Sequence, residues 1–194
     1  SSVGTLGSFS DDAIDVIRVD TFERFMALMT WLLESGEEIP YDAVVIDTFD
    51  VAQDRAVKHF QDNAPRTKGG EKDGFAAWGN IKKWTLDLGQ DLRNAPFKVV
   101  VVFHETEDKM SDGSVRKNLA LSGSAKDVFP GIPDMVVWLE RKMVDGAPTT
   151  IGYFETEDNK VTKNRFGFPP VVQNVSFPGL FKFIEDKQNN KKED

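Results

Sequence analysis

The sequence predicts an α/β protein with a mostly parallel sheet, helices on both faces and antiparallel strands at the C-terminal edge. In the first two thirds of the chain, short apolar runs rich in β-branched residues alternate with segments of helical periodicity. The last third instead carries strand patterns separated by short turns, which favours antiparallel pairing. A length of 194 residues suits one domain. We expect that domain to span residues 1–186 and to be followed by a charged tail at 187–194.

The N-terminal part begins with a small, polar loop over residues 1–10 and a strand over 14–19, where apolar and polar residues alternate. Residues 21–35 place apolar side chains three and four positions apart, which predicts an amphipathic helix. The unbroken apolar run at 43–46 is too short for a helix and predicts a strand buried on both faces. A second helix is expected over 50–61.

The middle of the chain contains two polar segments on either side of a helix and a strand. Residues 63–74 hold one proline and three glycines and have nothing to bury, so we expect a mobile loop. Residues 75–94 return to helical periodicity, with Trp84 off the main apolar stripe and therefore expected to be exposed. Residues 97–103 are the most strand-like segment, and 105–118 are predicted to form a second polar loop.

The C-terminal third predicts a strand at 134–141 and then a hairpin. The hairpin would pair residues 150–155 with 161–165 through a turn at 157–160. A short final helix is expected over 177–186.

Bulk composition excludes several classes of protein. The chain has no cysteine, so disulfides and thiolate metal sites are excluded. No apolar run reaches the roughly 18–20 residues needed to cross a bilayer, and no secretory signal is visible, so we expect a cytoplasmic protein without a membrane partner. The net charge of −8 argues against broad electrostatic coating of nucleic acid, although local basic loops remain able to contact phosphates.

The two residues that follow the apolar run at 43–46 are candidates for a metal site. Asp47 follows the predicted strand at once, and an ionised carboxylate is costly inside an apolar core, so we expect it at the carboxyl end of the strand. Asp47 with the neighbouring hydroxyl of Thr48 is typical of a Walker-B-type Mg²⁺ site, in which the aspartate holds the metal through water. The alternative is that one of the two residues only caps the following helix.

An ordered set of motifs extends beyond this site: YDAVVIDT, a helix, a Gly/Lys loop, VVVVFH, SGSAKDVFPGIPDMVVWLE and KNRFGFP. Over residues 15–170 this order resembles the RecA-like ATPases of bacteriophages that act in recombination or single-strand annealing. The resemblance implies a RecA-like P-loop NTPase core that uses ATP and Mg²⁺, a homo-oligomer, single-stranded DNA as partner, and the cytoplasm of a bacterial host as location.

The resemblance also implies residue roles. Asp47 matches the Walker B aspartate, and His104 at the end of the next strand matches a polar sensor of the γ-phosphate. Lys163 and Arg165 resemble the basic fingers that such subunits extend into a neighbour's ATP site. The two polar loops match DNA-facing loops, which makes their basic residues candidates for phosphate contacts: Lys68, Lys72, Lys109, Arg116 and Lys117. Solvated surface charges remain the alternative for all of these basic residues.

One departure from the family pattern concerns the phosphate cradle. A P-loop requires GxxxxGK(S/T), and this sequence has none, because Phe75 and Ala76 follow the correctly spaced Gly69 and Gly74. We therefore expect a fragment or remodelled relative that lacks the N-terminal part of the ATPase core. Such a chain should bind ATP weakly or not at all.

Two other functions compete with the ATPase hypothesis. The first is a non-enzymatic interaction or scaffold module on a decayed P-loop fold, which would be indifferent to nucleotide and DNA. The second is a hydrolase unrelated to nucleotides, which has little support because there is no cysteine and no GxSxG motif.

Overall fold

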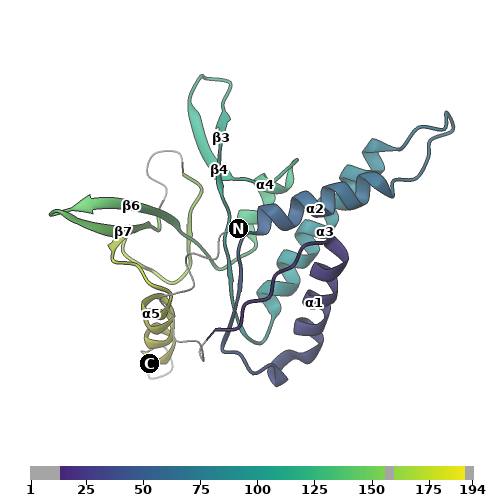
Figure 1. Ribbon diagram of the computed structural model, residues 1–194. Coiled ribbons are helices and arrows are strands. Elements are labelled where there is room, and N and C mark those ends of the chain that lie inside the picture. The colour runs from purple at the N-terminus through teal and green to yellow at the C-terminus, as the bar shows by residue number, and fades with distance from the viewer. Residues whose placement is uncertain (1–13, 156–159, 191–194) are drawn as a thin grey trace.

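The computed structural model describes residues 14–155 and 160–190, which form helices and short strands arranged around two apolar clusters (Figure 1). The elements in chain order are α1 (Phe22–Ser35), η2 (Gly36–Glu38), β1 (Ala43–Ile46), α2 (Phe49–Asp62), α3 (Gly74–Asn94), β2 (Lys98–Val101), β3 (Glu105–Lys109), β4 (Val115–Leu119), α4 (Ala125–Val128), η3 (Phe129–Gly131), β5 (Met135–Val136), β6 (Trp138–Val144), β7 (Ala147–Tyr153), β8 (Lys163–Asn164), β9 (Val171–Gln173) and α5 (Phe177–Asn190). The predicted loop at 1–10 lies outside the described residues, as does most of the predicted turn at 157–160.

The central feature is the parallel pair β1–β2, in which Ala43 lies opposite Lys98 and Ile46 opposite Val101. The strand predicted at 43–46 is confirmed. The prediction that this strand is buried on both faces is wrong, because Val45 is 53% exposed. A mostly parallel sheet is not found either: within the described residues β1–β2 is the parallel strand pair, and the other paired strands are antiparallel.

The larger apolar cluster joins α1, α2 and α3 to this strand pair. Thr21 caps α1 by accepting a hydrogen bond from the Arg24 N–H at 3.2 Å, and the helix then buries one stripe of side chains. Phe49 is fully buried and stacks on Trp84 with their ring centroids 5.9 Å apart. The expected exposure of Trp84 is therefore wrong. It packs into the cluster, whereas Phe75 and Trp78 of the predicted stripe are 94% and 43% exposed.

Two sequence-based expectations about strands fail in this half of the chain. Residues 14–19 form no strand, since no described strand pairs with them, and the side chains of Ile14, Val16 and Ile17 are exposed. Residues 105–118 form the antiparallel hairpin β3–β4 in place of a loop. Its turn contains Gly113 at φ +84°, a conformation that glycine adopts readily and that the sequence signal Asp112–Gly113 could have indicated.

The C-terminal third pairs its strands differently from the prediction. The strand β7 pairs with β6 through a tight turn at Asp145 and Gly146, where φ is positive, and on its other side β7 pairs with β9. The strand β8 pairs with β5, so the predicted pairing of 150–155 with 161–165 is wrong. The helix predicted at 177–186 is confirmed as α5 and continues to Asn190, into the segment expected to be a tail.

None of the helices within residues 14–155 and 160–190 combines the length and the apolar character that crossing a membrane demands.

Candidate functional site

The carboxyl ends of β1 and β2 form the candidate site. Backbone hydrogen bonds extend the parallel pairing past the strands themselves: the Val102 N–H donates to Ile46 O, and the Phe49 N–H donates to Val102 O, both at 2.9 Å. This pairing brings the segment that follows β1 beside the segment that follows β2. Asp47 and His104 therefore emerge at the same edge, as parallel strands require.

Asp47 has an exposed side chain and follows Ile46 directly. Among residues 14–155 and 160–190, no lysine, arginine or histidine forms an ion pair with its carboxylate; the nearby His104 pairs with Asp50 instead. The peptide bond between Asp47 and Thr48 is cis. An exposed carboxylate without a cationic partner at a ligand-binding edge is available to a divalent cation.

Thr48 occupies the N-cap position of α2, but its side chain makes no capping hydrogen bond. Its hydroxyl is buried and has no hydrogen-bond partner within the described part of the chain. The capping alternative for Thr48 is therefore not supported. The Thr48 hydroxyl nevertheless lies near Asp50, since it helps to lower the pKa of that carboxyl. The exposed carboxylate oxygens of Asp47 are hard donors of the kind that Mg²⁺ prefers.

These donors are too few to hold a metal alone. No group of three or more histidine, aspartate or glutamate side chains within residues 14–155 and 160–190 could hold a metal ion. Since Mg²⁺ takes about six oxygen ligands, most of them would have to come from water and substrate phosphates.

His104 is held by Asp50 of α2, a residue that the sequence analysis did not assign to the site. The Asp50 Oδ2 lies 2.8 Å from the His104 Nδ1, and its Oδ1 accepts from the His104 backbone N–H at 3.2 Å. The Asp50 side chain is 12% exposed and the His104 side chain 68% exposed. One buried carboxylate thus fixes both the backbone and the ring of an exposed histidine.

The contact between Asp50 and His104 shifts the pKa values of both side chains. Burial works against ionisation of Asp50, but the hydrogen bonds from the ring and backbone of His104 outweigh it, so the pKa of Asp50 lies below its ordinary value. The hydrogen bond to Asp50 and the Asp50 charge, with a smaller contribution from Asp47, raise the pKa of the His104 ring. Both shifts favour an ionised Asp50 beside a ring that carries a proton on Nδ1.

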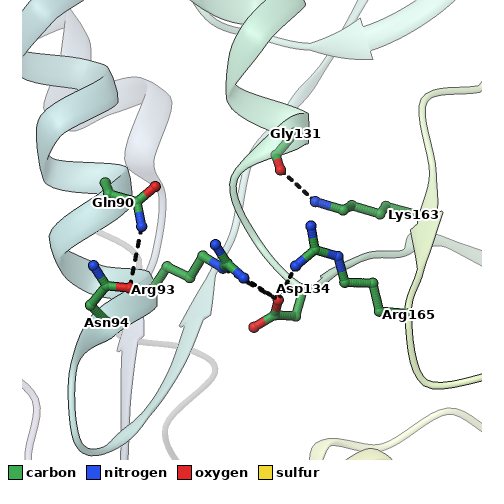
Figure 2. A network of polar contacts seen from close by, with 7 residues as sticks. All are labelled: Gln90, Arg93, Asn94, Gly131, Asp134, Lys163 and Arg165. Carbon is green, nitrogen blue, oxygen red and sulfur yellow. Dashed lines mark hydrogen bonds and ion pairs between the residues drawn. The ribbon is translucent and has the colours of Figure 1, made fainter.

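Lys163 and Arg165 lie in a separate cationic cluster, shown in Figure 2. The Arg165 guanidinium donates to Asp134 Oδ1 at 2.8 Å, and the Arg93 guanidinium donates to the same oxygen at 3.1 Å. Lys163 Nζ donates to the backbone carbonyl of Gly131. Burial, together with the charges of Arg165 and Arg93, lowers the pKa of Lys163, while Asp134 opposes that effect. Two guanidinium groups thus share one carboxylate, and Lys163 lies beside them on a backbone carbonyl.

Within the described residues, no hydrogen bond or ion pair joins this cluster to Asp47, Thr48 or His104. Arg93 is near the C-terminus of α3, five positions before Lys98 begins β2, whereas His104 follows the end of β2. The structure therefore brings Asp47, Thr48 and His104 together and keeps Lys163 and Arg165 apart from them. Sequence reasoning missed Arg93 and Asp134, because their contact spans 41 positions and no local pattern marks it.

A family model described as an AAA domain matches residues 5–166 of this chain. The chain belongs to this AAA domain family. No curated protein and no solved structure matches it. The AAA domain is of the P-loop NTPase type, so the chain is a nucleotide-binding, ATPase-like α/β domain, and domains of this family generally bind ATP with Mg²⁺.

The α2–α3 connection of the AAA domain, residues 63–73, projects from the body (Figure 1). It closes on itself through backbone hydrogen bonds, including Thr67 N–H to Glu71 O at 2.7 Å. Lys68 is exposed, and Lys72 lies 3.6 Å from the Asp62 carboxylate. The first predicted DNA loop is therefore an internally hydrogen-bonded projection with at least one solvent-facing cation.

The β3–β4 hairpin projects elsewhere on the AAA domain (Figure 1) and divides its cations between two faces. Lys109 and Lys117 lie on one face, with Lys117 opposite Glu107 and 3.5 Å from Glu105. Arg116 lies on the other face, opposite Asp108. Acidic neighbours therefore offset part of the positive charge of this second candidate DNA element.

Proposed function

We propose that this AAA domain acts in an ATP-dependent DNA recombination or annealing ATPase of the RecA-like phage type. The observation that carries the proposal is the shared edge of β1 and β2. There the Asp47 carboxylate, which has no ion-pair partner in the described part of the chain, lies near the Asp50-held ring of His104. Asp47 follows the end of β1 directly and His104 lies three positions after the end of β2, at the location where open α/β sheets bind ligands.

In this proposal Asp47 binds Mg²⁺ through water, and the Thr48 hydroxyl contributes a further oxygen beside it. The metal, when bound with ATP, supplies charge stabilisation for phosphoryl transfer. His104 donates to a phosphate oxygen when its ring is charged, or accepts a proton from water when neutral.

Lys163 and Arg165 act on a neighbouring subunit's nucleotide in this proposal. Within the described residues neither side chain contacts Asp47, which is compatible with action in trans within a homo-oligomer. An arginine fork suits that role because it stays charged and binds phosphate in a bidentate way.

Single-stranded DNA would contact the two projecting elements. The exposed side chains of Lys68 and Lys109 support this assignment, with Arg116, Lys72 and Lys117 as more screened contacts. Such binding should weaken as salt rises, because each phosphate contact releases counterions.

The second candidate function is a scaffold module without nucleotide chemistry. It is favoured by one observation, the lack of GxxxxGK(S/T) in the 194 residues. The ATP affinity expected for this chain is accordingly low, so the test must detect weak binding.

Paramagnetic NMR with millimolar Mn²⁺-ATP provides such a test, since Mn²⁺ broadens signals near its site even at partial occupancy. We expect selective broadening at Asp47, Thr48 and His104 that is largely lost in Asp47→Asn. The control is Asp54→Asn, which removes an exposed charge from α2. Broadening that is uniform over the surface, or unchanged in Asp47→Asn, would favour the scaffold function.

A fluorescence-anisotropy titration with labelled single-stranded DNA tests whether the two projecting elements bind DNA. Lys68→Glu combined with Lys109→Glu should weaken binding at least several-fold and flatten its dependence on salt. Lys58→Glu, an exposed change on α2, is the matched control.

A further inference from the structure

We propose that Asp50 is a positioning residue for His104, which holds the imidazole with Nδ1–H toward α2 and leaves Nε2 for a ligand at the sheet edge. This inference rests on the proposed function only in its last step, the contact between His104 and a phosphate group. The orientation of the ring itself follows from contacts within the chain.

The geometry specifies the ring in two ways. Oδ1 of Asp50 accepts from the His104 backbone N–H, and Oδ2 lies 2.8 Å from Nδ1. The two oxygens therefore fix both the backbone of His104 and the orientation of its ring. A carboxylate can only accept at these distances, so Nδ1 must carry the hydrogen. Nε2 has no hydrogen-bond partner within the described residues, and it is the nitrogen left to meet a ligand.

Burial makes this contact a restraint on an otherwise mobile side chain. The His104 side chain is 68% exposed and would sample several rotamers if only solvent surrounded it. The Asp50 side chain, at 12% exposed, lies on α2 within one turn of Phe49, which is itself fully buried. Asp50 is therefore held by the core, and through its hydrogen bonds it restrains the exposed His104 ring at the sheet edge.

Asp50 also sets which chemistry His104 can perform. With Nδ1–H held, a neutral ring presents the lone pair of Nε2 and can accept from water. A charged ring presents Nε2–H and can donate to a phosphate oxygen. In either state the reactive nitrogen keeps the same position, which is the purpose of a positioning contact.

The first test reads the histidine tautomer by long-range ¹H–¹⁵N NMR on the intact chain, which contains two histidines. We expect the neutral wild-type His104 ring to be protonated on Nδ1. Asp50→Asn should abolish that preference, because an amide nitrogen can donate to Nδ1 and favour the other tautomer. His59, whose Nδ1 lies 2.9 Å from Glu23, is the internal control and should not change. A wild-type His104 protonated on Nε2 would overturn the proposal without any variant.

The second test adds millimolar Mg²⁺-ATP and follows the His104 ring signals. We expect a ligand-induced shift in the wild type and a shift at least several-fold smaller in Asp50→Asn, whereas Glu23→Gln should behave as the wild type. An equal shift in wild type and Asp50→Asn would overturn the positioning role while leaving the proposed function intact. An Asp50-dependent tautomer without any shift in the wild type would instead count against the proposed function and support the positioning of the ring.

Discussion

Two glycines of α3 differ only in what surrounds the missing Cβ atom. A Cβ on Gly89 would lie 2.6 Å from the ring of Phe129, which is buried, and 3.3 Å from Ile132. A Cβ on Gly79 would meet nothing within 4 Å. Gly89 is therefore a close-packing position between α3 and η3, whereas Gly79 is a helix position with no packing reason for glycine.

We predict opposite effects of alanine at these two positions. Gly79→Ala should stabilise the AAA domain by about 0.5–1 kcal/mol, because alanine loses less backbone entropy in a helix. Gly89→Ala gains the same propensity but forces Phe129 to move, and overpacking costs about 1–3 kcal/mol, so a net loss of roughly 1–2 kcal/mol is expected. Urea unfolding of both variants measures the difference. If both variants were stabilised to the same degree, the close contact of α3 with η3 would be absent.

At the scale of elements, one ion pair attaches the β3–β4 hairpin to α4. Lys126 Nζ donates to Asp108 Oδ1, and the Asn118 amide donates to Oδ2 at 3.3 Å. Both charged side chains are about three-quarters buried, at 28% and 25% exposed. Lys126 is therefore engaged within the protein and is a poor candidate for contact with DNA.

This pair predicts a pH dependence of stability. The hydrogen bond from Lys126, which outweighs burial, lowers the pKa of Asp108 below its ordinary 3.8. A lowered folded-state pKa contributes stability above the unfolded value, and that stability is lost as the pH falls through the folded value. Asp108→Asn should thus destabilise the protein by about 0.5–1 kcal/mol near pH 7. The difference from wild type should shrink as the pH falls below about 4.

Denaturant unfolding at several pH values measures this difference. Asp127→Asn, an exposed change on α4, is the control. A gap between wild type and Asp108→Asn that stays constant from pH 7 to pH 3 would contradict the prediction.

The elements that the sequence predicts well are those whose signal is local. The helices α1, α2, α3 and α5 follow from periodicity, and β1 and β2 follow from apolar runs. The hairpin β3–β4 was missed because its strands are charged and carry little apolar alternation. The partners of β7 and β8 were wrong because strand pairing depends on distant segments.

The residues of the candidate site likewise differ in whether a local sequence signal marks them. That Asp47 and His104 lie at the same edge could be predicted, because each comes after a strand that the sequence identifies. Asp50 could not, because its contact with His104 spans 54 positions and its place at the start of α2 is equally typical of a helix terminus.

At the scale of the whole molecule, the polar cluster of Figure 2 connects the helical region to the C-terminal strands. Asp134 accepts hydrogen bonds from Arg93 of α3 on one side and from Arg165, which follows β8, on the other. Removing this carboxylate would leave two guanidinium groups facing each other with Lys163 nearby. The connection between the two regions would then change from attraction to repulsion.

We therefore predict that Asp134→Asn lowers stability in a salt-dependent way. The loss should be about 1 kcal/mol at low ionic strength, since Asp134 is 42% exposed and water already screens the pair. It should diminish toward 1 M NaCl, where the Debye length falls to about 3 Å and repulsion among the remaining cations is screened. Thermal unfolding at low and high salt measures the effect, with Asp54→Asn as the control. Equal losses at both salt concentrations would show that Asp134 acts only through local hydrogen bonds. Restoration of stability by adding Arg165→Gln to Asp134→Asn would identify cation repulsion as the cause.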